Sequence, residues 1–301
     1  MAETEGRIIR GVGGLYFVDT EKKVIECRAR GKFRHGNESP QVGDFVIVET
    51  AEQGENVIKE ILPRKNLLIR PAMSNLDDLF AVIPSASPSP DLPTVDKLTA
   101  IAVHNKISVC CVIGKCRLDE KNTERISEIY KKSGMRLFVT DSVTGDGIDE
   151  LRDFILARGE KRVAAFAGAS GVGKSTLLNA LFPDLSLATG SVSERTERGR
   201  HTTRKVELFA KGGGYIADTP GFTMLDFKQF DFMSKEDLPY AFPEFLPYLG
   251  KCRYRKCTHT KEEGCAILEA IDDGIIAPER HKSYTDLYLI LKDKHEWDKK
   301  H

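Results

Sequence analysis

Residues 168–175 read G-A-S-G-V-G-K-S and form the pattern in this chain that points most clearly to chemistry. The pattern lies between a strand-like apolar run at 162–167 and a helix-like run at 175–181. In a G-x-x-x-x-G-K-S loop, backbone N–H groups face the phosphates, Lys174 reaches the β and γ phosphates, and Ser175 offers its hydroxyl to Mg²⁺. The chain is therefore predicted to bind a nucleoside triphosphate. The predicted phosphate contacts are Gly168, Ala169, Ser170, Gly171, Val172, Gly173, Lys174, Ser175 and Thr176.

A second motif, D-x-x-G, begins at Asp218 directly after the apolar run 215–217 and ends at Gly221. In guanine-nucleotide-binding proteins this carboxylate holds Mg²⁺, and the glycine N–H senses the γ-phosphate. Thr202 and Thr203, in the charged segment between the two motifs, are candidates to close on Mg²⁺ and the γ-phosphate. The predicted Mg²⁺ ligands are Ser175, Thr203 and Asp218.

The segment expected to read the base lies in an unusual place. A conventional GTPase carries N-K-x-D after D-x-x-G, but nothing of the kind follows Gly221. Upstream, the apolar run 109–113 ends in G-K-C-R-L-D at 114–119. This is where the motif falls if the domain is circularly permuted, a change that preserves the packing because the chain is cut at a surface loop. The base contacts are therefore assigned to Gly114, Lys115, Cys116 and Arg117.

That base segment departs from N-K-x-D at two positions. The aspartate of the motif accepts hydrogen bonds from guanine N1 and N2, whereas Arg117 has only donors. Asp119 lies two residues further on and is an acceptor only if the loop is remodelled. The second base loop, usually Ser-Ala, is changed to Asp141-Ser142. Guanine specificity therefore does not follow from the sequence.

Late in the chain, three cysteines and one histidine lie within fourteen residues. The spacing is C-x₄-C-x-H-x₅-C, a ligand set suited to a closed, structural Zn²⁺ site. The surrounding segment is too polar to bury free cysteines, so zinc is expected to organise it. The predicted zinc ligands are Cys252, Cys257, His259 and Cys265.

The elements that must position these motifs follow from the apolar patterns. Short alternating runs up to residue 70 predict a small all-β, OB-like barrel of about five strands, which serves either to bind oligonucleotides or only for packing and protein contacts. Beyond residue 71, strands alternate with helices, which predicts a mostly parallel, doubly wound α/β sheet. The strands are expected at 79–83, 107–113, 135–139 and 162–167, and the helices at 96–104, 124–132 and 148–157. Two further strands are expected at 206–209 and 215–217, and a helical tail at 283–297. The predicted domains are 1–70, 71–225 and 226–301.

The bulk composition limits the possible partners. The chain has 301 residues and a formal net charge of zero, so the overall field favours neither nucleic acid nor membrane. No apolar run is long enough to span a bilayer, and the cysteine placement suits a reducing compartment, so we expect a cytoplasmic protein. We also expect a monomer. Two basic runs are candidate RNA contacts or simply solvated faces: Arg195, Arg198, Arg200, Arg204 and Lys205, and Lys251, Arg253, Arg255 and Lys256.

Taken together, the chain resembles the ribosome small subunit-dependent GTPase A family. The resemblance extends over nearly the whole chain: the barrel, P-R-K-N-L-L at 63–68, G-R-H-T-T at 199–203, D-T-P-G-F at 218–222 and the late cysteine cluster. It implies an N-terminal OB-like barrel, a circularly permuted P-loop GTPase domain and a C-terminal zinc-binding α-helical domain. It also implies GTP and GDP as ligands and the small ribosomal subunit with its rRNA as partner, with GTP hydrolysis driving release after late assembly.

The catalytic residue and the function each have alternatives. Phe222 stands where many GTPases carry a water-positioning glutamine, so His201 is the candidate catalytic residue, unless it only packs the loop or contacts RNA. One rival is an RNA-binding assembly factor with relaxed base specificity or little turnover. The other is an ATPase on the same scaffold.

Overall fold

The computed structural model describes residues 2–20, 22–34, 39–51, 54–69, 72–185, 187, 206–218 and 233–293. They fall into two units, which we describe separately. Unit 1 comprises residues 1–78, 154–166 and 196–222, and unit 2 comprises 79–153, 167–195 and 223–301. The boundaries predicted at residues 70 and 225 stay predictions.

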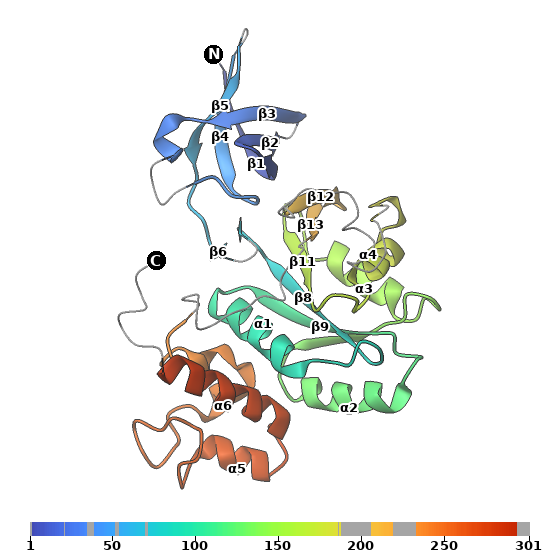
Figure 1. The fold of residues 1–301 in the computed structure, drawn as a ribbon, viewed down its shortest axis with the longest axis vertical. Coiled ribbons are helices and arrows are strands. Elements are labelled where there is room, and N and C mark those ends of the chain that lie inside the picture. The colour runs from blue at the N-terminus through green and yellow to red at the C-terminus, as the bar shows by residue number, and fades with distance from the viewer. Residues whose placement is uncertain are drawn as a thin grey trace. The chain divides into compact units, whose positions relative to one another are not determined.

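In unit 1, the first five strands close into a barrel (Figure 1). They are β1 (Ala2–Val12), β2 (Leu15–Asp19), β3 (Val24–Ala29), β4 (Phe45–Thr50) and β5 (Asn56–Ile61), with η1 (Gly31–Arg34) after β3. The order is β1-β2-β3-β5-β4, and β4 pairs back with β1, so the predicted five-strand barrel is confirmed. Alternate strand positions face the core, where Ile8, Val18, Val46 and Ile58 are fully buried.

Three further strands of unit 1 lie beside the barrel. They are β11 (Val163–Ala167), β12 (Glu207–Lys211) and β13 (Gly214–Asp218). β11 is parallel to β13, whereas β12 and β13 form an antiparallel hairpin. The antiparallel strand is β12, which also pairs antiparallel with β1 at Arg10 and Glu207. A short hairpin, β6 (Leu67–Leu68) and β7 (Met73–Ser74), follows the barrel.

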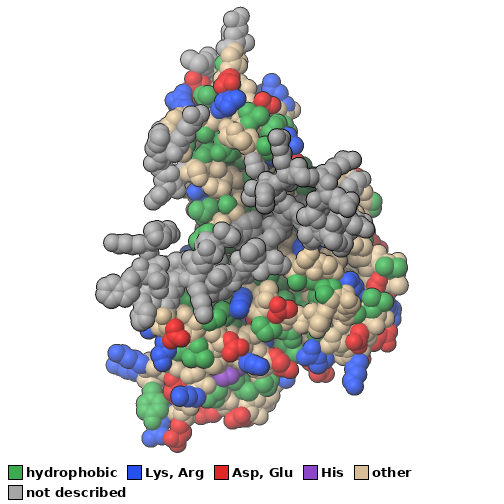
Figure 2. Space-filling view, viewed as in Figure 1, with side chains coloured by type: hydrophobic (Ala, Val, Ile, Leu, Met, Phe, Trp, Pro, Cys, Tyr) green, Lys and Arg blue, Asp and Glu red, His purple; other side chains and the backbone are tan. Residues whose placement is uncertain are grey.

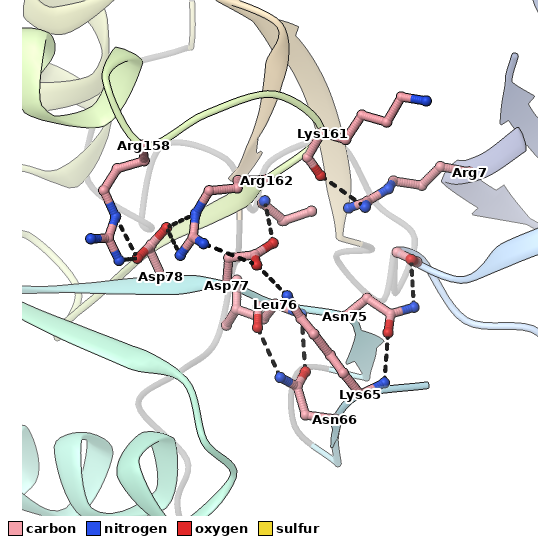
Figure 3. Close-up of polar contacts among 12 residues, drawn as sticks. Arg7, Lys65, Asn66, Asn75, Leu76, Asp77, Asp78, Arg158, Lys161 and Arg162 are labelled. Carbon is pink, nitrogen blue, oxygen red and sulfur yellow. Dashed lines mark hydrogen bonds and ion pairs between the residues drawn. The ribbon is translucent and has the colours of Figure 1, made fainter. Parts of the chain in front are cut away.

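Asp77 and Asp78, which follow the β6–β7 hairpin, form hydrogen bonds at the start of β11 (Figure 3). Strand β11 leads into residues 168–175. Asp78 is buried, and its two oxygens accept from Arg158 Nε at 3.1 Å and Arg162 Nη2 at 2.9 Å. Asp77 accepts from the Val163 backbone N–H at 2.9 Å. Because both arginines remain partly exposed and paired, burial of the Asp78 charge is compensated.

Asparagine side chains tie the β6–β7 hairpin together in the same region (Figure 3). Asn66 bonds both to the Leu76 carbonyl at 2.8 Å and to the Leu76 N–H at 3.0 Å. Asn75 accepts from the Lys65 N–H at 2.9 Å and donates to the Gly43 carbonyl at 3.1 Å. The P-R-K-N segment noted in the sequence thus completes backbone hydrogen bonds around the barrel exit.

Arg7 joins the barrel strand β1 to the rest of unit 1. Its guanidinium is buried, lies over the Phe45 ring at 4.2 Å and the Tyr215 ring at 5.2 Å, and donates to the Lys161 carbonyl at 2.9 Å. Tyr215 in turn donates to Asp19 at 3.0 Å. Burial lowers the pKa of Arg7, yet two aromatic faces and one carbonyl stabilise its charge.

Unit 2 contains the strands β8 (Asp78–Pro84), β9 (Ser108–Gly114) and β10 (Arg136–Val139), in the order β10-β9-β8. Its helices are α1 (Leu92–His104), α2 (Glu120–Lys131), α3 (Ile148–Leu156) and α4 (Lys174–Leu181), with η2 (Pro183–Leu185) after α4. β9 and β10 are parallel, as predicted for a doubly wound arrangement. Near-continuous apolar burial in β8 and β9 is typical of strands covered on both faces.

Helices α1 and α2 begin four residues earlier than the apolar pattern predicts. At α1, Asp91 accepts from Thr94 N at 3.1 Å, with Pro93 in the first turn. At α2, Asp119 accepts from Asn122 N at 2.9 Å. Aspartate caps satisfy the first free N–H groups, so a polar first turn can be helical before the apolar stripe begins.

The C-terminal part of unit 2 contains η4 (Leu238–Ala241), η5 (Pro243–Tyr248), α5 (Ala266–Asp272) and α6 (Pro278–Lys292). The fully buried Arg280 of α6 donates to Asp96 of α1 at 2.7 Å and to Glu244 of η5 at 2.7 Å. Burial alone lowers the pKa of Arg280, but the two carboxylates outweigh it and raise the pKa. Tyr130 of α2 also donates to Asp96, at 2.9 Å. The C-terminal helices and the strand-flanking helices therefore share one buried network.

The surface of the described residues is of mixed charge. In Figure 2, Lys and Arg side chains lie among Asp and Glu side chains across the visible face, in keeping with 45 residues of each sign in the chain. Among the described residues, no helix combines the length and apolarity needed to cross a membrane.

Candidate functional site

The predicted phosphate loop connects β11 to α4. Gly168 has φ of +154°, and a Cβ at this position would lie 2.6 Å from the Val82 carbonyl oxygen, so only glycine fits. Gly173, with φ of +100°, precedes the first residue of α4. Lys174 Nζ points back over the loop and donates to the carbonyls of Gly168 at 2.7 Å and Ala169 at 2.8 Å. A cation thus stands above a loop that opens a helix, which is the arrangement that phosphates require.

The segment after β9 lies directly against this loop. Lys115 adopts φ of +61°, and its Nζ donates to the Gly171 carbonyl at 3.2 Å and the Ser87 carbonyl at 2.5 Å. Its backbone carbonyl accepts from Ser85 Oγ at 2.6 Å. The structure therefore brings the predicted base segment, 114–117, next to the predicted phosphate loop.

The second base loop, after β10, is tied to the first. Cys116 N donates to the Thr140 carbonyl at 3.2 Å. Asp141 is buried and accepts from the backbone N–H groups of Val143 at 2.9 Å and Arg117 at 3.3 Å. Gly147 ends the loop with φ of +66°, where a Cβ would lie 2.1 Å from a backbone carbonyl oxygen. Asp141, at a position that is usually serine, thus sets the shape of both loops.

At the tip of these loops, Arg117 is paired with Asp146. Arg117 Nε lies 2.6 Å from Asp146 Oδ2, and Thr144 Oγ1 donates to the same oxygen at 2.8 Å. Arg117 Nη1 is 3.4 Å from Glu120. Hydrogen bonds from Arg117 and Thr144 lower the pKa of Asp146, so this carboxylate is ionised at neutral pH. Asp119, the other acceptor considered from the sequence, caps α2 instead.

The remaining nucleotide-site predictions concern other parts of the chain. Asp218 is the last residue of β13, as expected from its apolar lead-in, but its side chain lies outside the described part of the structure. His201, Thr202, Thr203 and Gly221 also lie outside the described residues. Their roles stay predictions.

The four predicted metal ligands converge in unit 2. Their donor atoms all lie within 4.8 Å of one another. Cys252 Sγ is 3.5 Å from His259 Nδ1 and 3.9 Å from Cys265 Sγ, and the latter is 3.6 Å from His259 Nδ1. Tetrahedral Zn²⁺, with Zn–S near 2.3 Å and Zn–N near 2.0 Å, separates ligands by about 3.8 Å (S to S) and about 3.5 Å (S to N). The donor set, completed by Cys257, therefore fits a zinc tetrahedron.

Neighbouring groups hold this loop in place. His259 has φ of +59°, and its carbonyl lies 2.7 Å from Nε2 of His281 on α6. Tyr284, also on α6, donates to the Thr258 carbonyl at 2.7 Å. Burial lowers the pKa of His259, which keeps its imidazole neutral and available as a ligand. Burial likewise raises the pKa of the metal-free Cys257 thiol to about 12, so a bound cation is needed to make it a thiolate.

Some residues around the nucleotide site were missed from the sequence. Ser85 and Ser87 belong to the Ser/Pro-rich stretch 84–90, which contains none of the predicted site residues. They contact Lys115 through one hydroxyl and one carbonyl. The position of the stretch, directly after a buried strand, was an available signal, because ligands bind at the carboxyl ends of strands in α/β sheets.

Comparison with known sequences places these features in a family. The RsgA GTPase profile matches residues 61–228, and the RsgA N-terminal domain profile matches residues 5–58. A Caldanaerobacter subterraneus subsp. tengcongensis protein named small ribosomal subunit biogenesis GTPase RsgA is 41% identical over 296 residues, covering 98% of each chain. A Moorella thermoacetica protein of the same name is 40% identical over 281 residues, covering 93% of this chain and 94% of the relative.

Solved structures agree with this grouping. YloQ, described as a circularly permuted GTPase, superposes with a TM-score of 0.77 at 33% identity, covering 98% of this chain and 96% of that one. YjeQ from Thermotoga maritima gives a TM-score of 0.80 at 30% identity, covering 98% of this chain and all of that one. The predicted fold class, a β-barrel, a circularly permuted P-loop domain and a C-terminal Cys/His cluster, is confirmed.

Proposed function

Because this chain belongs to the RsgA GTPase family of P-loop enzymes, we propose that it binds the small ribosomal subunit and assists its late assembly. GTP hydrolysis to GDP and phosphate then lowers its affinity for the subunit and drives release. The protein acts in the cytoplasm as a monomer, with rRNA among its contacts. The names of the relatives, small ribosomal subunit biogenesis GTPase RsgA, support the partner.

One observation carries the nucleotide part of this proposal. The contact of Lys115 Nζ with the Gly171 carbonyl brings the segment after β9 against the phosphate loop, although the two are 56 positions apart. Along the chain, the base segment comes first, then the phosphate loop, then the D-x-x-G motif, which is the order of a circularly permuted domain. The geometry supports a nucleotide whose phosphates lie at 168–176 and whose base lies by 114–117.

In the proposed hydrolysis, Lys174 and the loop N–H groups hold the phosphates. Ser175, Thr203 and Asp218 would hold Mg²⁺, which would supply positive charge to the β and γ phosphates. Gly221 and Thr202 respond to the γ-phosphate, and His201 orients the attacking water. Substitution of His201 by alanine is expected to leave nucleotide affinity near normal and to lower turnover.

We expect RNA to bind to the barrel and to the Cys/His loop at residues 252–265. Lys251, Arg253, Arg255 and Lys256 are exposed on the loop that carries the Cys/His cluster. Arg253 lies 5.6 Å from the half-exposed ring of Tyr254, which offers a surface for base stacking. Zn²⁺ bound by Cys252, Cys257, His259 and Cys265 serves only to keep this basic segment rigid.

The direct test is GTP turnover by the purified protein, with and without small ribosomal subunits. We expect the subunit to stimulate turnover and the GTP-bound form to bind it more tightly than the GDP-bound form. Lys174→Ala should abolish phosphate-dependent binding, whereas Lys211→Ala, on β12, should not. Subunit binding that is the same with GTP, GDP and no nucleotide would contradict the proposed switch.

A second function is favoured by Arg117, which stands where the motif has its guanine-reading aspartate. It is an RNA-binding assembly factor with relaxed base specificity, using ATP or mixed nucleotides, or with little turnover. RNA binding indifferent to nucleotide would support this alternative. A preference for ATP would instead identify an ATPase on the same scaffold.

A further inference from the structure

The ends of β9 and β10 define where the base of a bound nucleotide must lie. Lys115 fixes the first of these ends against the phosphate loop through Gly171, and Cys116 links it to Thr140 on the second. In doubly wound sheets, ligands occupy the space beyond the carboxyl ends of the strands. With phosphates at 168–176, the base therefore extends toward residues 115–119 and 140–147.

Two carboxylates at this end are already committed to the backbone. Asp141 is 4% exposed and accepts from the N–H groups of Arg117, Val143 and Thr144. Asp119 accepts from the first turn of α2. Moving either carboxylate would leave backbone N–H donors without partners, so these bonds hold both carboxylates in place.

The pair Arg117 and Asp146 is different, because its bonds join side chains rather than the backbone and leave one donor and one acceptor unused. Its side chains are 56% and 39% exposed, and Asp146 Oδ2 accepts from both Arg117 Nε and Thr144 Oγ1. Within the described residues, Asp146 Oδ1 and Arg117 Nη2 have no hydrogen-bond partner. The loops thus present a donor and an acceptor side by side.

This pairing decides which bases can be accepted. Guanine offers an acceptor, O6, beside the N1–H donor, whereas adenine offers an N6 donor beside the N1 acceptor. A lone carboxylate only accepts, so it suits guanine N1–H and N2–H₂ and repels adenine N1. A guanidinium beside a carboxylate can satisfy either purine after a small side-chain rotation.

Because Arg117 and Asp146 are exposed to solvent, binding the wrong purine does not leave buried polar groups unpaired. A site discriminates by factors of about 10⁴ to 10⁵ when the wrong ligand leaves buried polar groups unpaired. At Arg117 and Asp146, water can pair whichever group the base does not use. The cost of the wrong purine is correspondingly small.

We propose that Arg117 and Asp146 form the base-contacting pair and admit both purines, so that the site uses GTP and ATP with similar efficiency. The inference rests on the proposed function only in taking residues 168–176 as the phosphate site. Arg117 is the specificity-determining residue, and Asp146 positions its guanidinium.

The test is displacement of a fluorescent GDP analogue from the full-length, zinc-loaded protein by GTP or ATP at one Mg²⁺ concentration. We expect the two dissociation constants, and the two kcat/KM values, to agree within about tenfold. The double variant Arg117→Asp, Asp146→Asn leaves a lone carboxylate at 117 and should favour GTP over ATP by about a hundredfold or more. Arg136→Asp, a matched control with 57% exposure at the opposite end of β10, should leave the ratio unchanged.

Each outcome decides between the proposals. A GTP preference of a hundredfold or more in the native protein would overturn the inference and leave the proposed GTPase function intact. Failure to bind any nucleotide would overturn both. If the double variant folds with an unchanged melting temperature but keeps the native ratio, Arg117 does not determine specificity.

Discussion

The Cys/His loop and the base loops are both short polar segments of unit 2, but they are held in opposite ways. Three donors of the Cys/His loop stand at zinc-like separations, and the fourth, Cys257, lies within 4.8 Å of them. Helix α6 supports the loop through His281 and Tyr284. The base loops have a committed frame, set by Asp141, and an exposed tip, the Arg117–Asp146 pair. Buried neighbours fix one arrangement in the first loop, and solvent permits several in the second.

This difference teaches where selectivity comes from. A donor set held by buried contacts costs little to order when the ligand arrives, and it excludes ligands of another geometry. An exposed ion pair contributes little to stability and adapts to its ligand.

Removal of one metal ligand should affect the Cys/His loop most strongly. Cys257→Ser should reduce bound zinc from about one ion per chain to almost none, since structural sites need all four ligands. Zinc content by elemental analysis and amide exchange at residues 252–265 would measure this. Cys110→Ala, which alters a cysteine outside the cluster, should keep its zinc. Full zinc retention by Cys257→Ser would show that the four residues do not form the site.

Replacement of the buried Arg280 should have the next largest effect. Arg280→Met leaves Asp96 and Glu244 buried without their partner, so we expect unfolding of unit 2 to become easier by about 3 to 5 kcal/mol. Chemical denaturation would measure the change, with the exposed Lys282→Met on the same helix as control. A loss below about 1 kcal/mol would mean that the network can relax.

Substitution of Glu262 is expected to have a smaller effect on stability. This residue bonds to the backbone of the Cys/His loop, of which it is a part. Its carboxylate accepts from Thr258 N at 2.9 Å and Thr260 N at 3.1 Å. Although burial raises the pKa of Glu262, hydrogen bonds from Thr258 and the loop backbone outweigh it and lower the pKa to about 2. A lowered carboxyl pKa adds stability above the unfolded value of about 4.3, which is lost as pH falls toward 2.

Glu262→Gln should therefore destabilise the protein at pH 7 by about 1 kcal/mol, after allowing for solvent screening. The difference from the native protein should shrink as pH falls from about 4.3 to 2, because the native carboxylate is then protonated. Melting temperatures of both proteins across this range would measure it. Glu263→Gln, at the exposed neighbour, should have no such pH dependence. A difference that stays constant with pH would contradict the assignment.

The smallest effect on stability is expected at the base loops. Arg117→Ala removes an exposed ion pair and should leave the melting temperature almost unchanged, because water screens the two charges. Thermal unfolding would show this, in contrast to the strong effect of Arg280→Met. A fall in melting temperature comparable to that of Arg280→Met would mean that the Arg117–Asp146 pair holds the base loops together, as buried contacts hold the Cys/His loop.

Much of the fold could be predicted because its signals are local. Alternation of apolar residues predicted a barrel of about five strands before residue 70, and the longer spacing of strands and helices located β8 to β11. The helix starts were less accurate, since Asp91 and Asp119 extend α1 and α2 beyond their apolar stripes. The short helix α5 was missed, because seven residues carry too little periodicity.

The sequence by itself determined the phosphate loop, the permuted motif order and the four zinc-ligand candidates, because each depends on spacing over a few residues. Only the tertiary structure decided what surrounds them. In the folded protein, Lys115 contacts the phosphate loop and Asp119 caps a helix. Arg117 pairs with Asp146, and Arg280 pairs with Asp96, which is 184 positions away in the chain. These partners lie far apart in the chain, and side-chain pairing at such separations is fixed by packing rather than by any local pattern.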